Sequence, residues 1–173
     1  ELVVFIIWGP LMIAGGYSAI TGLPWDWNVA IASIPYGLGP TCVIFGKHID
    51  KRLADKSKKI HTLPVIIGET ASRNIILIML ALMYFFIIYQ VVTGFYTIGM
   101  LVVLISLKNI RRPLSMFRQP LPKEKPADLP DGIWPLWFSG AAFLHTRTFG
   151  TYFMLGLILD SILKHNNFLN FIN

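Results

Sequence analysis

The 34 residues from Asn74 to Leu107 include no charged side chain, and this run constrains the fold more than any other feature of the chain. As a single α-helix it would be about 51 Å long, whereas the hydrocarbon core of a bilayer is about 30 Å thick. We therefore expect the run to fold back on itself as a helical hairpin. Gly94 is the favoured turn residue, which leaves a second arm of about 13 residues that must tilt or thin the bilayer to span it.

Three further segments of the chain are apolar over most of their length. Leu2 to Ile20 and Trp27 to Phe45 are each about as long as a spanning helix, and Phe149 to Leu163 forms one more crossing, preceded by the apolar piece Ile133 to Leu144. Hydrophobic residues make up 54% of the chain and the mean hydropathy is +0.60, values typical of membrane proteins. The sequence thus predicts an all-α, polytopic transmembrane helix bundle with five crossings.

Glycine and proline interrupt the first two spans, for example at Gly9-Pro10, Pro35 and Gly39-Pro40. Such residues kink or unwind a helix, and lipid cannot satisfy the backbone groups that they free. We therefore expect these positions to face neighbouring helices or a cavity.

Positive charge is concentrated in two segments, residues 47–59 and 108–125. Basic loops next to apolar runs are typical of the cytoplasmic face of a membrane, so both segments are expected there with an even number of crossings between them. The chain is thus predicted to be a multi-pass protein of the cell or inner membrane, with a cytoplasmic aspartate-containing loop at 46–73 and a Pro-rich cytoplasmic linker at 108–132. The net charge of +6 does not indicate nucleic-acid binding, because it is not gathered on one soluble face.

The first basic loop also contains two carboxylates, Asp50 and Asp55. Mg²⁺ commonly takes one or two protein carboxylates and completes its shell with water and phosphate, while nearby cations neutralise the remaining phosphate charge. The alternative is an ordinary exposed ion pair between Lys51 and Asp55, which are four residues apart. On one regular helix, Asp50 and Asp55 would point about 140° apart, so either the helix ends between them or they do not ligate one ion.

Neither the histidines nor a known catalytic motif identifies a reaction for this chain. His48 and His61 could act as bases or contact phosphate, although histidines in a charged loop are commonly just solvated. The sequence contains no Ser/His/Asp arrangement, zinc-ligand spacing, P-loop or dinucleotide-binding glycine pattern. It therefore does not indicate a hydrolase, a zinc site or a nucleotide-binding site.

The order of several short motifs resembles a known family. Gly-Pro-Leu-Met-Ile-Ala-Gly-Gly-Tyr at residues 9–17 is followed by Thr21-Gly22, by a span leading into residues 49–55, and then by Thr-Leu-Pro-Val at 62–65 and Gly68-Glu69. This order resembles the UbiA-type intramembrane prenyltransferases, and most of all the 1,4-dihydroxy-2-naphthoate polyprenyltransferase branch. The similarity covers about residues 9 to 73, with weaker agreement in helix layout thereafter.

The resemblance implies a bundle of nine transmembrane helices, of which this chain would supply the last five. It also implies two aspartate-rich motifs that hold a prenyl diphosphate through Mg²⁺, with Asp50 and Asp55 as metal ligands of the second motif. The naphthoate branch has Arg-Asp where this chain has Asp50-Lys51, which leaves the identity of the first ligand open. The first motif, of Asn-Asp-x-x-Asp type, does not occur in this sequence, so we expect the chain to lack its N-terminal part and to be inactive alone.

The implied function is transfer of a prenyl group from a polyprenyl diphosphate to an aromatic acceptor, as in quinone and menaquinone biosynthesis. The candidate diphosphate ligands are the cations beside the two aspartates: Lys47, Lys51, Arg52 and Lys56. Aromatic faces would line the prenyl or acceptor pocket, for which Tyr17, Tyr36 and Phe45 are candidates, although aromatic residues in membrane helices commonly just pack. The alternative is a non-catalytic membrane protein, transporter-like or a degenerate relative, whose basic loop only sets topology or contacts lipid.

Overall fold

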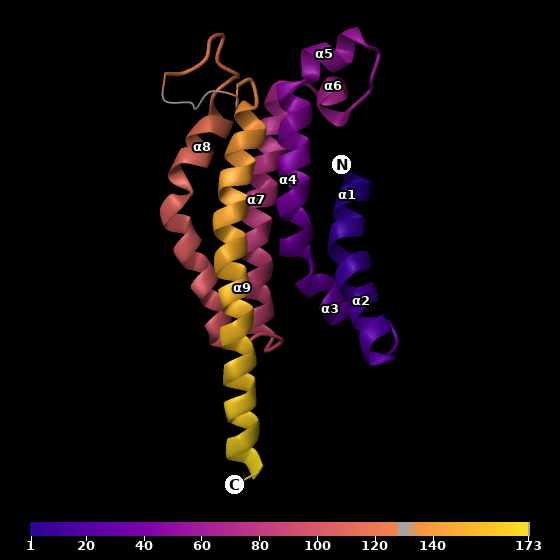
Figure 1. The fold of residues 1–173 in the computed structure, drawn as a ribbon, viewed down its shortest axis with the longest axis vertical. Helices are drawn as coiled ribbons and strands as arrows, with labels where there is room; N and C mark the ends of the chain where they lie inside the picture. Colours follow the sequence, from indigo (N-terminus) through magenta and orange to yellow (C-terminus); the bar gives the residue numbers. More distant parts are fainter. Residues whose placement is uncertain (128–131, 133, 173) are drawn as a thin grey trace.

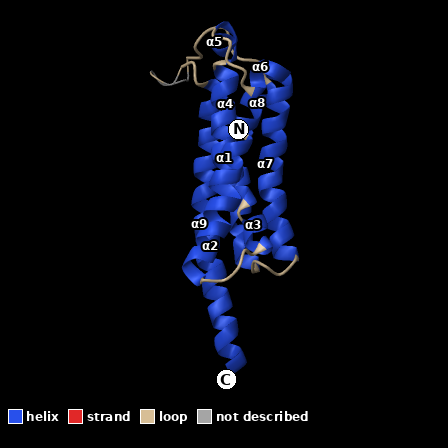
Figure 2. Ribbon diagram, turned by 90° about the vertical axis from the view of Figure 1, so that its right-hand side faces the viewer, coloured by secondary structure: helices blue, strands red, loops and turns tan. Residues whose placement is uncertain are grey.

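The computed structural model describes residues 1–127, 132 and 134–172, with side chains described as far as His165. Within these residues every regular element is a helix, which confirms the predicted all-α class (Figure 2). The longer helices run close to the long axis of the molecule (Figure 1). In chain order the elements are α1 (Leu2–Ile6), η1 (Ile7–Leu11), α2 (Met12–Thr21), α3 (Trp27–Ala32), α4 (Ile34–Asp50), α5 (Arg52–Ser57), α6 (Leu63–Ile67), α7 (Glu69–Val92), η2 (Ile98–Asn109), α8 (Arg111–Arg118) and α9 (Trp137–Ile172).

The first two predicted spans form a helical hairpin. α1, η1 and α2 follow one another over Leu2–Thr21, and α3 with α4 returns over Trp27–Asp50; both stretches are long and apolar enough to cross a membrane. Gly22 ends α2 in the left-handed region with φ of 70°. The Asp26 carboxylate then starts α3 by accepting the N–H of Asn28 at 2.7 Å.

The Gly9-Pro10 pair lies in a short π-helix, η1, inside this first span. A proline has no N–H to donate, and the wider π-turn accommodates it without ending the helix. Gly9 is buried against α4, where a Cβ on Gly37 would lie 2.8 Å from the Gly9 Cα. These two glycines therefore allow two helices to approach closely, which favours the helix-packing role over the cavity role at this position.

The long uncharged run forms the hairpin expected from its length. α7 ends at Val92, Gly94 takes a positive φ of 77°, and η2 begins at Ile98. The short second arm is lengthened by its winding, because η2 is a 3₁₀-helix. At about 2.0 Å per residue its 12 residues cover about 24 Å, whereas an α-helix of the same length would cover about 18 Å. Tilt or membrane thinning is therefore not the only way to make up the deficit.

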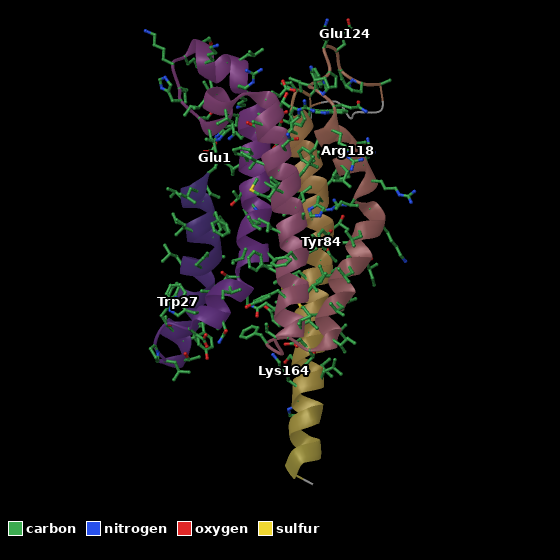
Figure 3. All side chains as sticks on the ribbon, turned by 180° about the vertical axis from the view of Figure 1, so that it is seen from behind. Glu1, Trp27, Tyr84, Arg118, Glu124 and Lys164 are labelled. Carbon is green, nitrogen blue, oxygen red and sulfur yellow. The ribbon has the colours of Figure 1, made fainter. Side chains whose placement is uncertain are left out.

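Both basic segments lie at one end of the molecule. α5, α6 and the connection after α8 occupy the end that is uppermost in Figure 1, and the α7–η2 turn lies at the other end. Figure 3 likewise places Arg118 and Glu124 at the upper end and Trp27 and Lys164 lower in the molecule. The even number of crossings that the charge pattern indicates stays a prediction. We call the end with the basic segments the basic end of the bundle.

The two predicted cytoplasmic loops contain more helix than expected. Residues 46–73 include the end of α4, the short helices α5 and α6, and the first turn of α7. Residues 108–118 complete η2 and form α8, so the irregular linker begins only at Gln119. Residues 128–131 of that linker lie outside the described residues.

The last helix differs most from the sequence prediction. α9 runs without a break from Trp137 to Ile172, whereas we expected a separate apolar piece over 133–144 before a crossing at 149–163. Ile133 itself lies outside the described residues. At 1.5 Å per residue the 36 residues of α9 are about 54 Å long, and its C-terminal part extends beyond the other helices (Figures 1 and 2).

Three helical stretches in the described part of the chain are long and apolar enough to span a bilayer: Leu2–Thr21, Trp27–Asp50 and Glu69–Val92. η2 is a shorter apolar helix. Large apolar side chains such as Ile20 and Val92 are at least 80% exposed, a surface suited to lipid. The structure is thus compatible with a membrane protein, and the five-crossing arrangement stays a prediction.

Buried polar contacts link the long helices through the core. The Tyr84 hydroxyl of α7 lies 2.8 Å from the Ser106 Oγ of η2 and 2.9 Å from the His145 Nε2 of α9. All three side chains are buried, and Tyr84 is marked in Figure 3. Because buried polar groups without partners are costly, this cluster fixes how α7, η2 and α9 face one another.

A second polar contact holds α9 near the α7–η2 turn. The buried Asp160 carboxylate accepts the backbone N–H of Thr97, and Lys164 lies 2.9 Å away on the next turn of α9. Lys164 also donates to the carbonyl of Phe95 at 2.7 Å. An acidic residue within an apolar helix is therefore neutralised where the hairpin turns.

Candidate functional site

Asp50 is the last residue of α4 and binds the start of α9. Its Oδ1 accepts the N–H of Phe138 and its Oδ2 accepts the N–H of Ser139, both at 2.9 Å. The first N–H groups of a helix have no partner within the helix, so a carboxylate there satisfies them and complements the helix dipole. Gly46, one turn earlier, makes this approach possible, because a Cβ there would lie 2.8 Å from the carbonyl of Phe138.

Asp55 lies on a different helix from Asp50. α4 ends at Asp50, Lys51 breaks the helical geometry, and Asp55 is half-buried on α5. Of the two alternatives that the five-residue spacing left open, the helix does end between the aspartates. No group of three or more His, Cys, Asp or Glu side chains that could hold a metal occurs among the described residues. A metal ion shared by Asp50 and Asp55 stays a prediction.

Glu69, in the first turn of α7, joins the charged groups at this end. Its carboxylate lies 3.7 Å from Arg52 Nη2 and 3.6 Å from Arg73 Nε, and it accepts the N–H of Leu121 at 3.1 Å. It is also close enough to Asp50 for the two negative charges to repel each other. Glu69 was not among the predicted site residues, although an acidic residue just after Gly68 is a usual sign of a helix start.

The predicted diphosphate ligands are not in equivalent positions. Lys47, Lys51 and Lys56 are exposed. Arg52 is half-buried and paired with Glu69. The structure therefore places three of the four cations on the surface of the basic end and turns the fourth toward α7.

The two histidines of the loop differ in the same way. His48 is half-buried, and its Nδ1 lies 2.7 Å from the Glu1 carboxylate, so the expectation of simple solvation is wrong for this residue. His61 is exposed, as expected for a solvated histidine.

The three candidate pocket aromatics separate in the structure. Phe45 is 1% exposed and belongs to the apolar core, so it packs rather than lining a pocket. Tyr17 is half-buried on α2. Tyr36 alone of the three is among the residues that line the cavities described below.

Two apolar cavities meet at Tyr36 and Phe153. One has a volume of about 360 Å³ and lies between α2, α3, the α7–η2 turn and α9; the other, of about 220 Å³, lies between α4 and α9. Tyr96 also lines the larger cavity.

The charged groups and the cavities lie at different depths along α4. Fourteen residues separate Tyr36 from Asp50, which corresponds to about 21 Å along a helix. An extended, apolar molecule with a charged head could therefore contact both. Comparison with protein-family models, with curated proteins and with solved structures finds no match to this chain.

Proposed function

We propose that this chain is part of an intramembrane prenyltransferase that transfers a prenyl group from a polyprenyl diphosphate to an aromatic acceptor, as in quinone biosynthesis. The observation that carries the proposal is on α4: one end presents Asp50 beside Glu69 and Arg52, and the other end lines apolar cavities at Tyr36. The order of short motifs, which resembles that of the UbiA-type enzymes, supports the same reaction. The basic end would face the cytoplasm.

The charged end offers groups suited to a diphosphate. Mg²⁺, when bound, would neutralise the charge that the diphosphate gains as it leaves. Asp50 and Asp55 are the candidate ligands, and the chemistry of Asp50 fits, because its carboxylate has about four acceptor positions and the backbone N–H groups at the start of α9 do not fill all of them. The exposed Lys47, Lys51 and Lys56 would contact phosphate oxygens directly, and Arg52 would do so from its pair with Glu69.

The apolar cavities would hold the prenyl chain. The allylic cation forms beside the leaving diphosphate, whereas Tyr36 is about 21 Å from Asp50 along α4. Tyr36 and Phe153 would therefore contact the tail, and the acceptor would bind nearer the charged end. Both cavities are lined mainly by apolar side chains, as a polyprenyl tail requires.

The test is prenyl transfer in membranes that contain the full-length protein, supplied with a radiolabelled polyprenyl diphosphate and several aromatic acceptors, with and without Mg²⁺. We expect Asp55→Ala to abolish Mg²⁺-dependent product formation. Asp26→Ala is the matched control, because this carboxylate starts α3 at the opposite end of the bundle. Unchanged turnover in the Asp55→Ala protein would refute the assignment.

A second candidate is a non-catalytic membrane protein whose basic end only sets topology or contacts lipid. The observation that favours it is that Asp50 and Arg52 each have a structural partner, the start of α9 and Glu69 respectively. These contacts would explain both side chains without a ligand. In this case no acceptor yields a prenylated product, with or without Mg²⁺.

A further inference from the structure

A cationic pocket of about 390 Å³ lies between the η2–α8 junction and α9. From the first side it is lined by Lys108, Asn109, Arg111 and Arg112, and from α9 by Leu144 and Thr148. None of the residues proposed above for diphosphate or prenyl binding lines it. The pocket is therefore separate from the candidate active site.

The chemistry of this lining suits an anion. Lys108 and Arg111 bring two positive charges to one hollow, Arg112 adjoins them, and none of the residues lining it is acidic. The Asn109 amide adds a neutral donor. Thr148 donates its hydroxyl hydrogen to the carbonyl of Leu144 within α9, so the donors to a ligand come from the η2–α8 side.

The pocket lies at a depth that suits a lipid headgroup. With a rise of about 2.0 Å per residue, Lys108 is about 20 Å above Ile98 at the opposite end of η2. Arg111 follows about 5 Å further on, so Arg111 lies about 5 Å and Lys108 about 10 Å inside the border of a hydrocarbon core about 30 Å thick that begins at Ile98. Long basic side chains at that depth reach the headgroup region.

An apolar track continues from the pocket toward the middle of the bundle. Because a 3₁₀-helix has three residues per turn, Ile105 lies directly beneath Lys108, and Ile105 is 39% exposed. On α9, Leu155 shares a face with Leu144 and Thr148, and it is 42% exposed. A free phosphate ion would make no contact with this apolar surface, whereas the acyl chains of a lipid would cover it.

We propose that this pocket binds the headgroup phosphate of an anionic phospholipid whose acyl chains lie along Ile105 and Leu155. Basic pockets between membrane helices are a recognised way to bind anionic headgroups. The inference stands on the pocket and its surroundings and does not depend on the proposed prenyltransferase activity. It adds a lipid partner at a second place on the chain.

The experiment measures lipid retained by the purified chain in native mass spectrometry, after exchange into nanodiscs containing phosphatidylglycerol or, as the neutral arm, phosphatidylcholine only. We expect wild type to retain phosphatidylglycerol in preference, and the Lys108→Gln/Arg111→Gln protein to retain about tenfold less. Lys58→Gln/Lys59→Gln is the control, because it removes the same charge from exposed positions on the α5 side and should change nothing. Equal loss in the two variants would overturn the proposal.

Two further arms keep the result unambiguous. The exchanged pair Lys108→Arg/Arg111→Lys keeps both charges and should retain phosphatidylglycerol, whereas loss in this protein would overturn a charge-based site. Millimolar inorganic phosphate or pyrophosphate should leave the bound lipid in place. Displacement by either anion would show a site for soluble phosphate compounds and would also overturn the proposal.

Discussion

Gly46 and Asp50 lie one turn apart on α4 and both contact the first turn of α9. The glycine leaves room for the backbone of Phe138, and the aspartate accepts the N–H groups of Phe138 and Ser139. A missing side chain and a charged one thus act together to join two helices whose contacting residues are almost 90 positions apart.

Gly46→Ala should destabilise the protein by about 1–3 kcal/mol, because its Cβ would meet backbone atoms of Phe138 and Ser139 at 2.8–2.9 Å and α9 would have to move. Thermal unfolding in detergent measures the change. Gly150→Ala is the control, since a Cβ there meets no atom within 4 Å and the substitution should be neutral or slightly stabilising. Equal melting temperatures for wild type and Gly46→Ala would contradict the close contact.

Asp50→Asn separates the structural role of this residue from a role in metal binding. Asparagine keeps one acceptor oxygen, but its amide nitrogen cannot accept an N–H, so Asp50→Asn should lose one of the two bonds to α9 and cost about 1 kcal/mol, whereas Asp50→Ala loses both and should cost about 1–3 kcal/mol. If Asp50 also binds Mg²⁺, the asparagine protein should be folded and yet lack Mg²⁺-dependent prenyl transfer. Thermal unfolding and the transfer assay on both variants give the answer, and full activity of Asp50→Asn would exclude Asp50 as a required metal ligand.

Tyr84→Phe should cost about 1–3 kcal/mol of stability, because it leaves the buried His145 Nε2 without its partner. His145 already has no partner at Nδ1, so the ring would then have none. Adding His145→Leu to Tyr84→Phe removes the orphaned ring and should recover part of the loss. A double-mutant cycle from thermal unfolding tests this, and strictly additive effects would argue against the contact.

Gly94→Ala should destabilise the α7–η2 hairpin by about 1 kcal/mol, because a left-handed backbone is unfavourable for residues with a Cβ. The cause is conformational and not steric, since a Cβ at this position meets no atom within 4 Å. Gly94→Asn should cost less, because asparagine tolerates this region better. Melting temperatures in the order wild type, Asn, Ala are expected, and an alanine protein as stable as wild type would contradict the turn geometry.

Sequence reasoning predicted the features that depend on length and local composition. The hairpin at Gly94 followed from an uncharged run too long for one helix, and the shared position of the basic segments followed from the charge pattern. The type of helix, whether α, 3₁₀ or π, was not predictable in the same way. The π-turn at Pro10 and the 3₁₀ form of η2 depend on neighbouring helices, which apolar periodicity does not describe.

The candidate site was predictable only in part for a related reason. Asp50 and Asp55 were found by their charge, but the bonds of Asp50 to Phe138 and Ser139 join distant parts of the chain and leave no local pattern. The pairing of Arg52 with Glu69 is equally non-local. Glu69 itself could have been identified from the sequence, because it lies at a helix start next to Gly68.

Two acids hold α9 at separate levels, and their spacing has a consequence for any bilayer around the protein. From Ser139, held by Asp50, to Asp160, held at Thr97, is 21 residues or about 32 Å of helix, close to the thickness of a hydrocarbon layer. The distance between these two contacts therefore sets the bilayer thickness that suits α9. In a much thicker membrane, one of these carboxylates would lie inside the hydrocarbon core. The bilayer would therefore have to become thinner around the protein.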